Sequence, residues 1–439
     1  MKITLHELRY DMAPFRTPFK FGASVISELC IPSVELRVAR DGKETTGRGS
    51  MPLGNAWSFP RVPYDQSLQA MQLIVDGIAQ ALENWETGDD PFEASFALRR
   101  LAMEVAAEAG QKLFGDARAV PDLCTLVASS CYDIALFDAW GHLEGANTYA
   151  RLRQSGADLA RWLGAEFRGY GLADALPPAP VRELSIFHVV GGLDPLTPGE
   201  VTERLDDGLP LDLQSWIQRD GLTHFKVKLR GADPEWDFNR ITAIDRACRE
   251  TVRARAGREP VYSLDLNEQC PSGTVLLEFL RRLEREAPEV LARIEFIEQP
   301  TTRDFSGAKE EGLAEASRIK PVVIDEGLTD FETLERALAL GYNGICLKAC
   351  KGIGFSLLAA AVARRRNLCL CVQDLTCPGL AFLASASLAA WTGVNALEAN
   401  ARQFCPTASA EAATTRPEVF ELRHGRIVTA GFTGAGLGY

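Results

Sequence analysis

Apolar and polar positions alternate along several short segments of the chain, and ionisable side chains stand near the end of each segment. Such alternation is typical of β-strands, because successive side chains point to opposite faces. In residues 224–229 the polar face carries Lys226 and Lys228, and in residues 261–268 it carries Asp265. The other face is apolar, as expected for a face covered by helices. The polar face is therefore predicted to point into an enclosed space, where an unpaired charge is costly.

Helical patterns separate these strand patterns along about half of the chain, residues 183–401. Between consecutive strands, apolar residues recur at spacings of three and four, which indicates amphipathic helices. Strands that alternate with helices predict a parallel sheet, and eight such units predict a TIM-type barrel whose active site lies at the carboxyl ends of the strands. The eight predicted strands are residues 183–190, 224–229, 261–268, 294–300, 322–327, 344–351, 368–374 and 395–401.

The fold class expected is therefore α/β, a TIM-type (β/α) barrel with an N-terminal α+β capping domain that the C-terminal tail completes. Residues 1–155 are expected to form the capping domain, with antiparallel strands joined by an Asp-Gly turn and three helices near 65–85, 92–114 and 121–145. Residues 182–405 are expected to form the barrel. Residues 406–439 are predicted to return to the capping domain, with a hairpin that turns at His424-Gly425.

Three acidic residues at successive strand ends are candidates for a metal site. They are Asp265, Glu298 and Asp325, and no histidine is among them. Carboxylate oxygens are hard ligands that suit Mg²⁺ or Mn²⁺ better than zinc, and Mg²⁺ usually adds water and substrate oxygens. An open cation site is therefore predicted. The alternative is that these acids only pair with lysines or cap the following helices.

Lysines are the second group of candidate catalytic residues. Lys226 and Lys228 share one strand face, and Lys348 is expected to face them across the barrel, whereas Lys351 falls on the opposite phase. Neighbouring like charges and desolvation disfavour a protonated lysine, so such a residue can serve as a base. Two such lysines could each address one face of a substrate carbon. The alternative is that they only form ion pairs with the carboxylates.

Taken together, the segments KVK, DLNE, EQP, DEG and LKACKGIG resemble the enolase superfamily, in particular its mandelate racemase and muconate lactonizing enzyme branches. The resemblance implies abstraction of the proton α to a carboxylate, with an enediolate held on Mg²⁺. It also implies that Lys228 and Lys348 are acid/base residues and that Lys226 is an electrostatic partner. By the same resemblance the metal ligands are Asp265, Glu298 and Asp325, with Glu326 as the alternative to Asp325.

The chain departs from the family pattern in ways that bear on the substrate. The seventh strand has no histidine and the sixth has no aspartate, which argues against racemization by a His/Lys pair. The eighth strand carries Glu398 and Asn400 in place of a DxD motif, so a dipeptide substrate is not indicated. Two segments, 16–24 and 47–60, are expected to close over the barrel mouth. The predicted substrate contacts are Asn267, Gln373, Asp374, Glu398, Pro18 and Lys20.

Several reactions fit these residues. Racemization or epimerization of a small carboxylic acid is favoured, because bases on both faces are what it requires. Dehydration of an acid sugar or other hydroxy acid and cycloisomerization on the same site stay open. A Schiff-base aldolase that uses Lys348 or Lys228 as nucleophile, and a non-catalytic carboxylate-binding protein, are the alternatives of another class.

Composition and net charge limit the classes of molecule that the protein is expected to bind. The formal net charge of −12 and a pI near 5.1 argue against nucleic acid and anionic membrane surfaces. No run of 18 or more apolar residues is apparent, so no membrane association is expected, and we expect a cytoplasmic homo-oligomer that acts on a small-molecule carboxylate. The 11 cysteines include Cys346, Cys350, Cys369, Cys371 and Cys377, which show no CxxC pairing, so neither a zinc cluster built from cysteines nor a disulfide framework is favoured.

Overall fold

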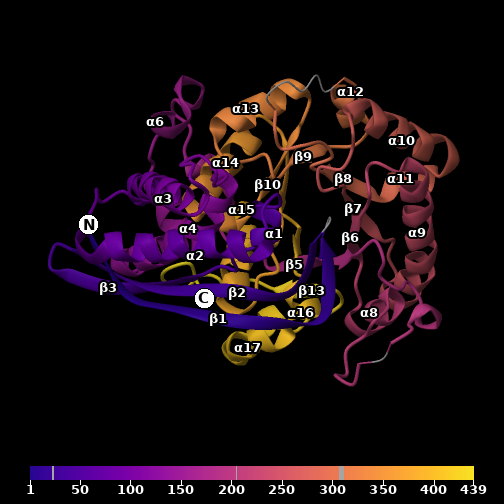
Figure 1. The fold of residues 1–439 in the computed structure, drawn as a ribbon, viewed down its shortest axis with the longest axis horizontal. Helices are drawn as coiled ribbons and strands as arrows, with labels where there is room; N and C mark the ends of the chain where they lie inside the picture. Colours follow the sequence, from indigo (N-terminus) through magenta and orange to yellow (C-terminus); the bar gives the residue numbers. More distant parts are fainter. Residues whose placement is uncertain (22–23, 204, 306–310) are drawn as a thin grey trace.

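The computed structural model describes residues 1–21, 24–203, 205–305 and 311–439, and it contains two sheets. A four-stranded antiparallel sheet is formed mainly by the N-terminal strands, and a second sheet closes into a barrel. In Figure 1 the long N-terminal strands run beneath the N-terminal helices and reach the barrel at their far end. The barrel is therefore approached from one side by the N-terminal sheet.

The N-terminal sheet has the order β3-β2-β1-β4. Asp41 and Gly42 join β2 to β3 with φ values of 52° and 76°, the left-handed geometry that tight hairpin turns require, which confirms the predicted turn. The first two strands are longer than expected: residues 16–21 continue β1 instead of forming a loop. The strands are β1 (Lys2–Phe21), β2 (Ser24–Arg40), β3 (Lys43–Ser50) and β4 (Trp85–Glu86).

Three long helices pack together beside this sheet, where the sequence predicted them. They are α2 (Tyr64–Ala81), α3 (Pro91–Phe114) and α4 (Asp122–Glu144). Helix α4 lies directly on β3, because Gly47 and Gly49 carry no Cβ: one added there would overlap the α4 backbone. Short helices follow or precede these three: α1 (Asn55–Ser58), α5 (Thr148–Gln154), α6 (Ala160–Leu163) and α7 (Leu172–Ala175).

Helix α4 differs from the expectation that no segment is long and apolar enough to span a membrane. By length and composition alone it is apolar enough to cross a bilayer, although no such segment was expected. Every residue of its apolar window is buried inside the protein, as in the core helix of a globular fold. The apolar character of α4 is therefore accounted for by its contacts with the sheet and the neighbouring helices.

Eight parallel strands form the barrel, and pairing of β12 with β5 closes it. This arrangement confirms the predicted TIM-type barrel with its N-terminal α+β part. The barrel strands are β5 (Glu183–Val190), β6 (His224–Lys228), β7 (Val261–Asp265), β8 (Ile294–Glu298), β9 (Val322–Ile324), β10 (Gly344–Leu347), β11 (Cys369–Val372) and β12 (Ala396–Glu398). The helices between them are α8 (Leu213–Asp220), α9 (Pro234–Ala256), α10 (Gly273–Glu286), α11 (Pro288–Arg293), α12 (Leu313–Ile319), α13 (Phe331–Leu340), α14 (Ile353–Arg365) and α15 (Gly379–Thr392).

The two faces of the barrel strands differ as alternation predicts. Outward-facing residues such as Phe225, Val227 and Leu264 belong to the large core shared with the helices. A separate small cluster comes from the opposite faces of six barrel strands, and its members are Phe187, Phe296, Val323, Cys346, Cys371 and Ala396. Residues two positions later in four of these segments are Glu298, Asp325, Lys348 and Glu398, so the charged layer lies directly above an apolar one.

The C-terminal part differs from the predicted hairpin. Residues Pro417–Phe420 form helix α18, since proline is favoured in the first turn of a helix. The predicted hairpin is reduced to a single bridge between Arg423 and Arg426, and β13 (Arg426–Val428) pairs antiparallel with β5. The last residues do reach the N-terminal part, where the Leu437 amide donates to Asp138 of α4 at 2.9 Å. Two further short helices precede α18: α16 (Ala401–Phe404) and α17 (Ala410–Thr415).

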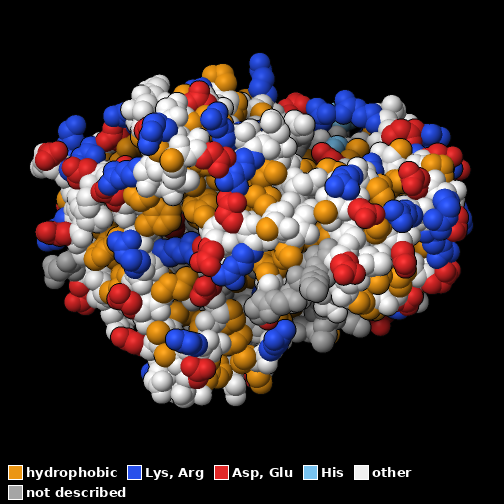
Figure 2. All heavy atoms as spheres, turned by 90° about the horizontal axis from the view of Figure 1, so that it is seen from above, with side chains coloured by type: hydrophobic (Ala, Val, Ile, Leu, Met, Phe, Trp, Pro, Cys, Tyr) orange, Lys and Arg blue, Asp and Glu red, His pale blue; other side chains and the backbone are white. Residues whose placement is uncertain are grey.

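The surface carries charges of both signs. On the face drawn in Figure 2, lysine and arginine side chains are interspersed with aspartate and glutamate. Among the described residues, the large apolar side chains that stay exposed are Met12, Val25, Leu193 and Leu205. Met12 and Val25 both belong to the β1–β2 hairpin, the element that extends over the barrel.

Candidate active site

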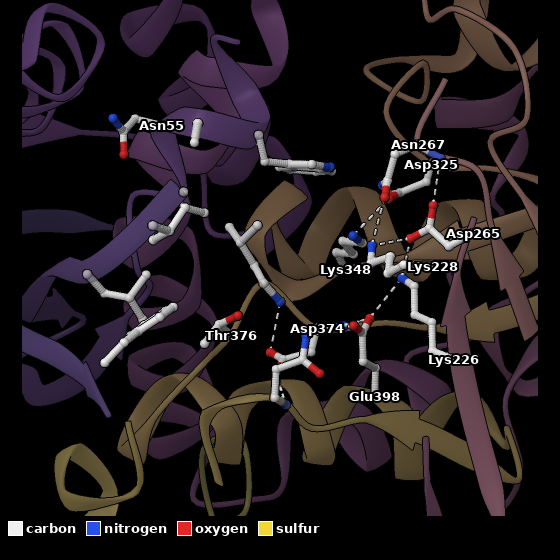
Figure 3. Close-up of a pocket in the computed structure, with 18 of the residues that line it drawn as sticks. Asn55, Lys226, Lys228, Asp265, Asn267, Asp325, Lys348, Asp374, Thr376 and Glu398 are labelled. Atoms are coloured by element: carbon white, nitrogen blue, oxygen red, sulfur yellow. Dashed lines mark hydrogen bonds and ion pairs between the residues drawn. The ribbon is translucent and has the colours of Figure 1, made fainter. Parts of the chain in front are cut away.

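A pocket opens at the carboxyl ends of the barrel strands, with about 690 Å³ of space that includes open solvent. The barrel supplies its charged side, and the N-terminal part supplies an apolar side that includes Phe15, Ile26, Leu29 and Trp57. Figure 3 shows Lys226, Lys228 and Lys348 converging with Asp265, Asp325 and Glu398. The site is thus built by two parts of the chain that are far apart in sequence.

Lys226 lies at the centre of the charged side of the pocket and contacts several carboxylates. Its ammonium group lies 3.0 Å from Asp265, 2.8 Å from Glu298 and 3.0 Å from Glu398, and the side chain is buried. Burial disfavours the charged form of Lys226, but the three carboxylates outweigh this effect and hold its pKa well above the usual range. Lys226 therefore stays protonated and neutralises acids that come from three different strands.

Lys228 occupies the pocket side of the same strand. It lies 2.5 Å from Asp265 and donates to the Asn267 side-chain oxygen at 3.0 Å. Burial raises the pKa of Asp265, but Lys226 and Lys228 outweigh burial and lower it to about 2. Asp265 is thus ionised and shared between two ammonium groups. Asn267 lies next to Lys228 with φ of 42°, because the chain turns sharply after β7.

Lys348 faces this pair from β10. Its ammonium lies 2.7 Å from Asp325 and 4.4 Å from the centre of the Trp57 ring, a cation–π contact. Burial lowers the pKa of Lys348, but Asp325 outweighs burial and holds it well above the usual range. The pKa of Asp325 is in turn held below its usual value, because Lys348 and Lys351 overcome the effect of burial. Asp325 is therefore ionised as well.

Lys351 lies in the same cluster, although strand phase predicted that it points the other way. Its ammonium donates to the Asp325 backbone oxygen at 2.6 Å and to the carboxylate at 3.0 Å. The reason is a 3₁₀ turn over Ala349–Lys351, which ends the two-residue alternation immediately after Lys348. Lys351 is not among the described residues that line the pocket, so it contacts Asp325 without lining the pocket itself.

Glu326 has a different role from that of its neighbour Asp325. One oxygen of Glu326 accepts from the Trp57 indole at 2.9 Å and from the Asn267 amide at 3.2 Å. Burial, together with repulsion from Asp325 and Asp265, raises the pKa of Glu326 to about 7. Glu326 thereby anchors Trp57, a pocket residue that sequence reasoning placed in a closing segment without singling it out.

Two of the three predicted metal ligands, Glu298 and Asp325, lie close together, and the thiol of Cys346 lies beside them. The ligand atoms of Glu298, Asp325 and Cys346 all lie within 4.8 Å of one another. Burial raises the pKa of Glu298 well above its usual range, and its Oε2 has no hydrogen-bond partner among the described residues. A buried carboxylate oxygen without a partner is costly, so this donor set fits a bound cation. The Cys346 sulfur lies beside two of the hard ligands that the sequence suggested.

The predicted substrate contacts on the last two strands divide into two groups. Asp374 and Glu398 line the pocket. Asp374 accepts from three backbone amides, and burial together with Glu398 raises its pKa to about 6. Glu398 binds Lys226 and accepts from the Asn400 side chain at 2.7 Å. Gln373 is buried, is not part of the described pocket lining, and has no partner for either amide atom among the described residues.

The predicted contacts in the first closing segment are not confirmed. Pro18 is exposed on β1 and is not among the described residues that line the pocket, and the side chain of Lys20 lies outside the described residues. Phe15 and Ile26 line the pocket instead, from the two strands of the same hairpin. Asn267, which was also predicted, does line the pocket. Phe15 and Ile26 both flank the predicted segment 16–24, which itself contributes no described residue to the pocket lining.

A comparison with family models finds one match, described as enolase C-terminal domain-like, over residues 211–439, which is more than half of the chain. A comparison with curated protein sequences finds no match.

Solved structures with the same fold cover the whole chain. A dipeptide epimerase from Cytophaga hutchinsonii, complexed with Mg and a dipeptide, has 17% identity and a TM-score of 0.59, covering 100% of this chain and 95% of that one. An N-succinyl Arg/Lys racemase from Bacillus cereus has 18% identity and a TM-score of 0.58, covering 100% and 95%. A muconate lactonizing enzyme from Pseudomonas fluorescens has 17% identity and a TM-score of 0.60, covering 100% and 96%. At this identity the likeness establishes the fold.

Proposed function

Because the chain belongs to the enolase C-terminal domain-like family, in the mandelate racemase and muconate lactonizing enzyme subgroup, we propose that it racemizes or epimerizes a small carboxylic acid. The family supports an isomerase or lyase. One observation carries the narrower proposal: Lys228 and Lys348 line the same pocket from strands that are four places apart in a ring of eight. Strands so placed lie on opposite sides of a barrel, so the lysines address opposite faces of a substrate held between them.

In this proposal Lys228 and Lys348 exchange roles with the direction of reaction. A neutral Lys228 takes the α-proton onto its Nζ, which leaves an enediolate, and the ammonium of Lys348 returns a proton to the other face. The reverse direction begins at Lys348 and ends at Lys228. Trp57 stacks on Lys348 and helps to hold it in place. Lys226, bound to three carboxylates, would keep the floor of the pocket electrically balanced.

Asp265, Glu298 and Asp325 are the residues we propose to hold Mg²⁺ or Mn²⁺, which would stabilise the charge that develops on the substrate carboxylate. The partnerless oxygen of Glu298 supports this assignment. Asp325 would then exchange Lys348 for the cation as its partner, which frees the lysine for proton transfer.

The ion-paired network also favours binding of cation and substrate together. With Glu298 ionised, as it would be as a metal ligand, four lysines and four carboxylates make the network formally neutral; they are Lys226, Lys228, Lys348, Lys351, Asp265, Glu298, Asp325 and Glu398. A divalent cation alone would add two charges to a buried network. Together with a substrate carboxylate it adds one, which costs less in a buried site. We therefore expect each ligand to strengthen binding of the other.

Exchange of the α-proton in D₂O, followed by proton NMR over a library of carboxylic acids, tests the proposal. We expect at least one acid to exchange, and we expect that exchange to stop when EDTA removes divalent cations. The Lys228→Ala/Lys348→Ala double variant should be inactive. Lys320→Ala is the matched control, because the Lys320 side chain donates to the Ile294 carbonyl and lies outside the described pocket.

Two results would contradict the proposal. Exchange that persists in the double variant would show that other residues remove the proton. Borohydride trapping of Lys348 or Lys228 with a carbonyl compound, with no exchange of any acid, would indicate the Schiff-base aldolase instead. Release of water or ring closure without inversion would leave the site intact and identify a dehydratase or a cycloisomerase.

A further inference from the structure

Asp133 is a buried carboxylate on helix α4 that contacts a helix of the barrel. One of its oxygens accepts from the backbone amide of Ile353 and, at 3.4 Å, from that of Gly354, and the other accepts from the Ser95 hydroxyl of α3. Burial raises the pKa of Asp133, and these three donors oppose that effect. Asp133 therefore joins the N-terminal part of the chain to the barrel.

Helix α14, to which these two amides belong, has no capping side chain of its own. Gly352 stands at its N-cap position with φ of 92°, and no side chain there accepts from the helix. The first amides of a helix have no partner within it, and they form the positive end of its dipole. The Asp133 carboxylate accepts from the first two, so it supplies the missing cap from a different helix.

The start of α14 packs closely against the N-terminal part. A Cβ added to Gly354 would lie 2.7 Å from the Ser95 hydroxyl and 3.1 Å from the Phe137 ring. A Cβ added to Gly352 would lie 3.1 Å from the Asp133 carboxylate. The first turn of α14 therefore has little free space against α3 and α4, and its position depends on the groups that hold it there.

The segment that begins α14 also carries Lys348. This lysine lies directly after β10 and before the 3₁₀ turn Ala349–Lys351, which leads into α14. The Lys348 carbonyl accepts from the Lys351 amide at 3.0 Å and from the Ser356 hydroxyl of α14 at 3.2 Å. Four residues separate Lys348 from Ile353. Because the backbone of Lys348 is bound to both the turn and the helix, a shift at the start of α14 would move the lysine.

We propose that Asp133 is a positioning residue for Lys348. By capping α14 from the N-terminal part, it holds the turn after β10 and keeps the Lys348 ammonium at the pocket. The inference rests on the proposed function, which makes Lys348 one of two bases. It adds that a carboxylate outside the described pocket lining determines how well this base works. Lys228 belongs to β6 on the opposite side of the barrel, so loss of Asp133 should impair one base and spare the other.

Exchange of the α-proton in each enantiomer of a substrate acid, measured for Asp133→Ala and Asp133→Asn, tests the inference. Asp133→Ala should lower kcat for the enantiomer that Lys348→Ala no longer exchanges, with KM nearly unchanged. The fall should be about 10²-fold, the usual effect of misplacing a reacting group by about 1 Å. Exchange of the other enantiomer should stay close to that of the unmodified protein. Asp133→Asn should show a smaller fall for the same enantiomer, because its amide oxygen still accepts from the two helix amides but lacks the negative charge.

Asp138→Ala is the matched control. Asp138 is a second buried carboxylate of α4, and it accepts from the backbone amides of Arg48 at 3.0 Å and Leu437 at 2.9 Å rather than from α14. Its loss should leave the ratio of the exchange rates of the two enantiomers unchanged. Amide hydrogen exchange in residues 349–356, followed by mass spectrometry, should accelerate in Asp133→Ala and not in Asp138→Ala.

An equal fall for both enantiomers, unchanged rates in both Asp133 variants, or the same change of ratio in Asp138→Ala would overturn the inference. Unchanged amide exchange in residues 349–356 would also overturn it, because α14 would then not depend on the cap. Asp133→Asn decides the outcome if Asp133→Ala does not fold. Failure of the proposed function would show instead in the unmodified protein, as no exchange of any acid, and the inference would fall with it.

Discussion

Replacement of Lys226 by methionine should destabilise the protein strongly, because the ammonium group serves three buried carboxylates. Asp265 would keep Lys228 as a partner at 2.5 Å, and Glu398 would keep the Asn400 amide at 2.7 Å. The Glu298 carboxylate would lose Lys226, its only hydrogen-bond partner among the described residues. Removal of one member of a buried ion pair costs about 3–5 kcal/mol, and we expect Lys226→Met to fall in this range at pH 8.

The loss should depend on pH in a definite direction. Lys226 is charged throughout pH 5–8, because its pKa is raised, so its own contribution is constant there and is lost only above its usual pKa. The pKa of Glu298 is already raised in the parent protein, and Lys226 is the charge that most lowers it, so this pKa rises further in the variant and protonation of Glu298 offsets part of the loss. The folded state then holds a proton that the unfolded chain releases near pH 4.3, so stability falls as pH rises above that value. The destabilisation by Lys226→Met should therefore be smaller at pH 5.5 than at pH 8.

Urea unfolding of metal-free protein at both pH values measures this effect. Lys320→Met is the control, because Lys320 donates to the Ile294 carbonyl and forms no recorded ion pair among the described residues. Loss of such a bond costs about 1 kcal/mol, and this loss should vary little over the same pH range. If Lys226→Met costs no more than Lys320→Met, or costs the same at both pH values, the three carboxylates do not depend on Lys226 and the reasoning is refuted.

Two further variants test how the N-terminal part meets the barrel. Trp57→Phe keeps a ring over Lys348 but removes the indole donor to Glu326, and it should cost about 1.5–3 kcal/mol in urea unfolding, the usual value of a hydrogen bond to a charged group. A cost below 0.5 kcal/mol would show that Glu326 does not anchor the indole. Gly49→Ala should cost about 1–3 kcal/mol or more, because a Cβ would overlap the α4 backbone, whereas Gly199→Ala, with no side-chain or backbone atom closer than 3.9 Å, should be nearly neutral. Equal stability of the two glycine variants would contradict the close packing of β3 on α4.

Sequence alternation was sufficient to predict the barrel and the inward position of its main charged residues. Lys226, Asp265 and Lys348 were placed correctly because side-chain phase within a strand is a local property. Lys351 was misplaced by the same rule, since the 3₁₀ turn after β10 ends the alternation within one residue of Lys348. A rule that depends on strand geometry holds only as far as the strand continues.

Alternation within a strand could not predict contacts between segments that are far apart in sequence. The segment 16–24 was expected to close over the barrel mouth, but the choice of Phe15 and Ile26 as lining residues depends on the register of the β1–β2 hairpin against the barrel. The position of Cys346 beside Glu298 depends on how three strands are spaced around a closed ring. The predicted C-terminal hairpin is limited to one bridge around the His424-Gly425 turn, because Pro417 begins a helix and β13 pairs with β5.

The opposed pair of lysines is tested most directly by the stereochemistry of exchange in single variants. Deuterium incorporation at the α-carbon of each enantiomer of a substrate would be followed in Lys348→Ala and in Lys228→Ala, with cation affinity measured alongside. We predict that each variant still exchanges one enantiomer, and not the same one, while exchange of the other falls by about 10²–10⁴-fold, the usual effect of losing a positioned acid or base. An equal fall for both enantiomers in Lys348→Ala, with cation binding unchanged, would contradict the assignment of two independent bases.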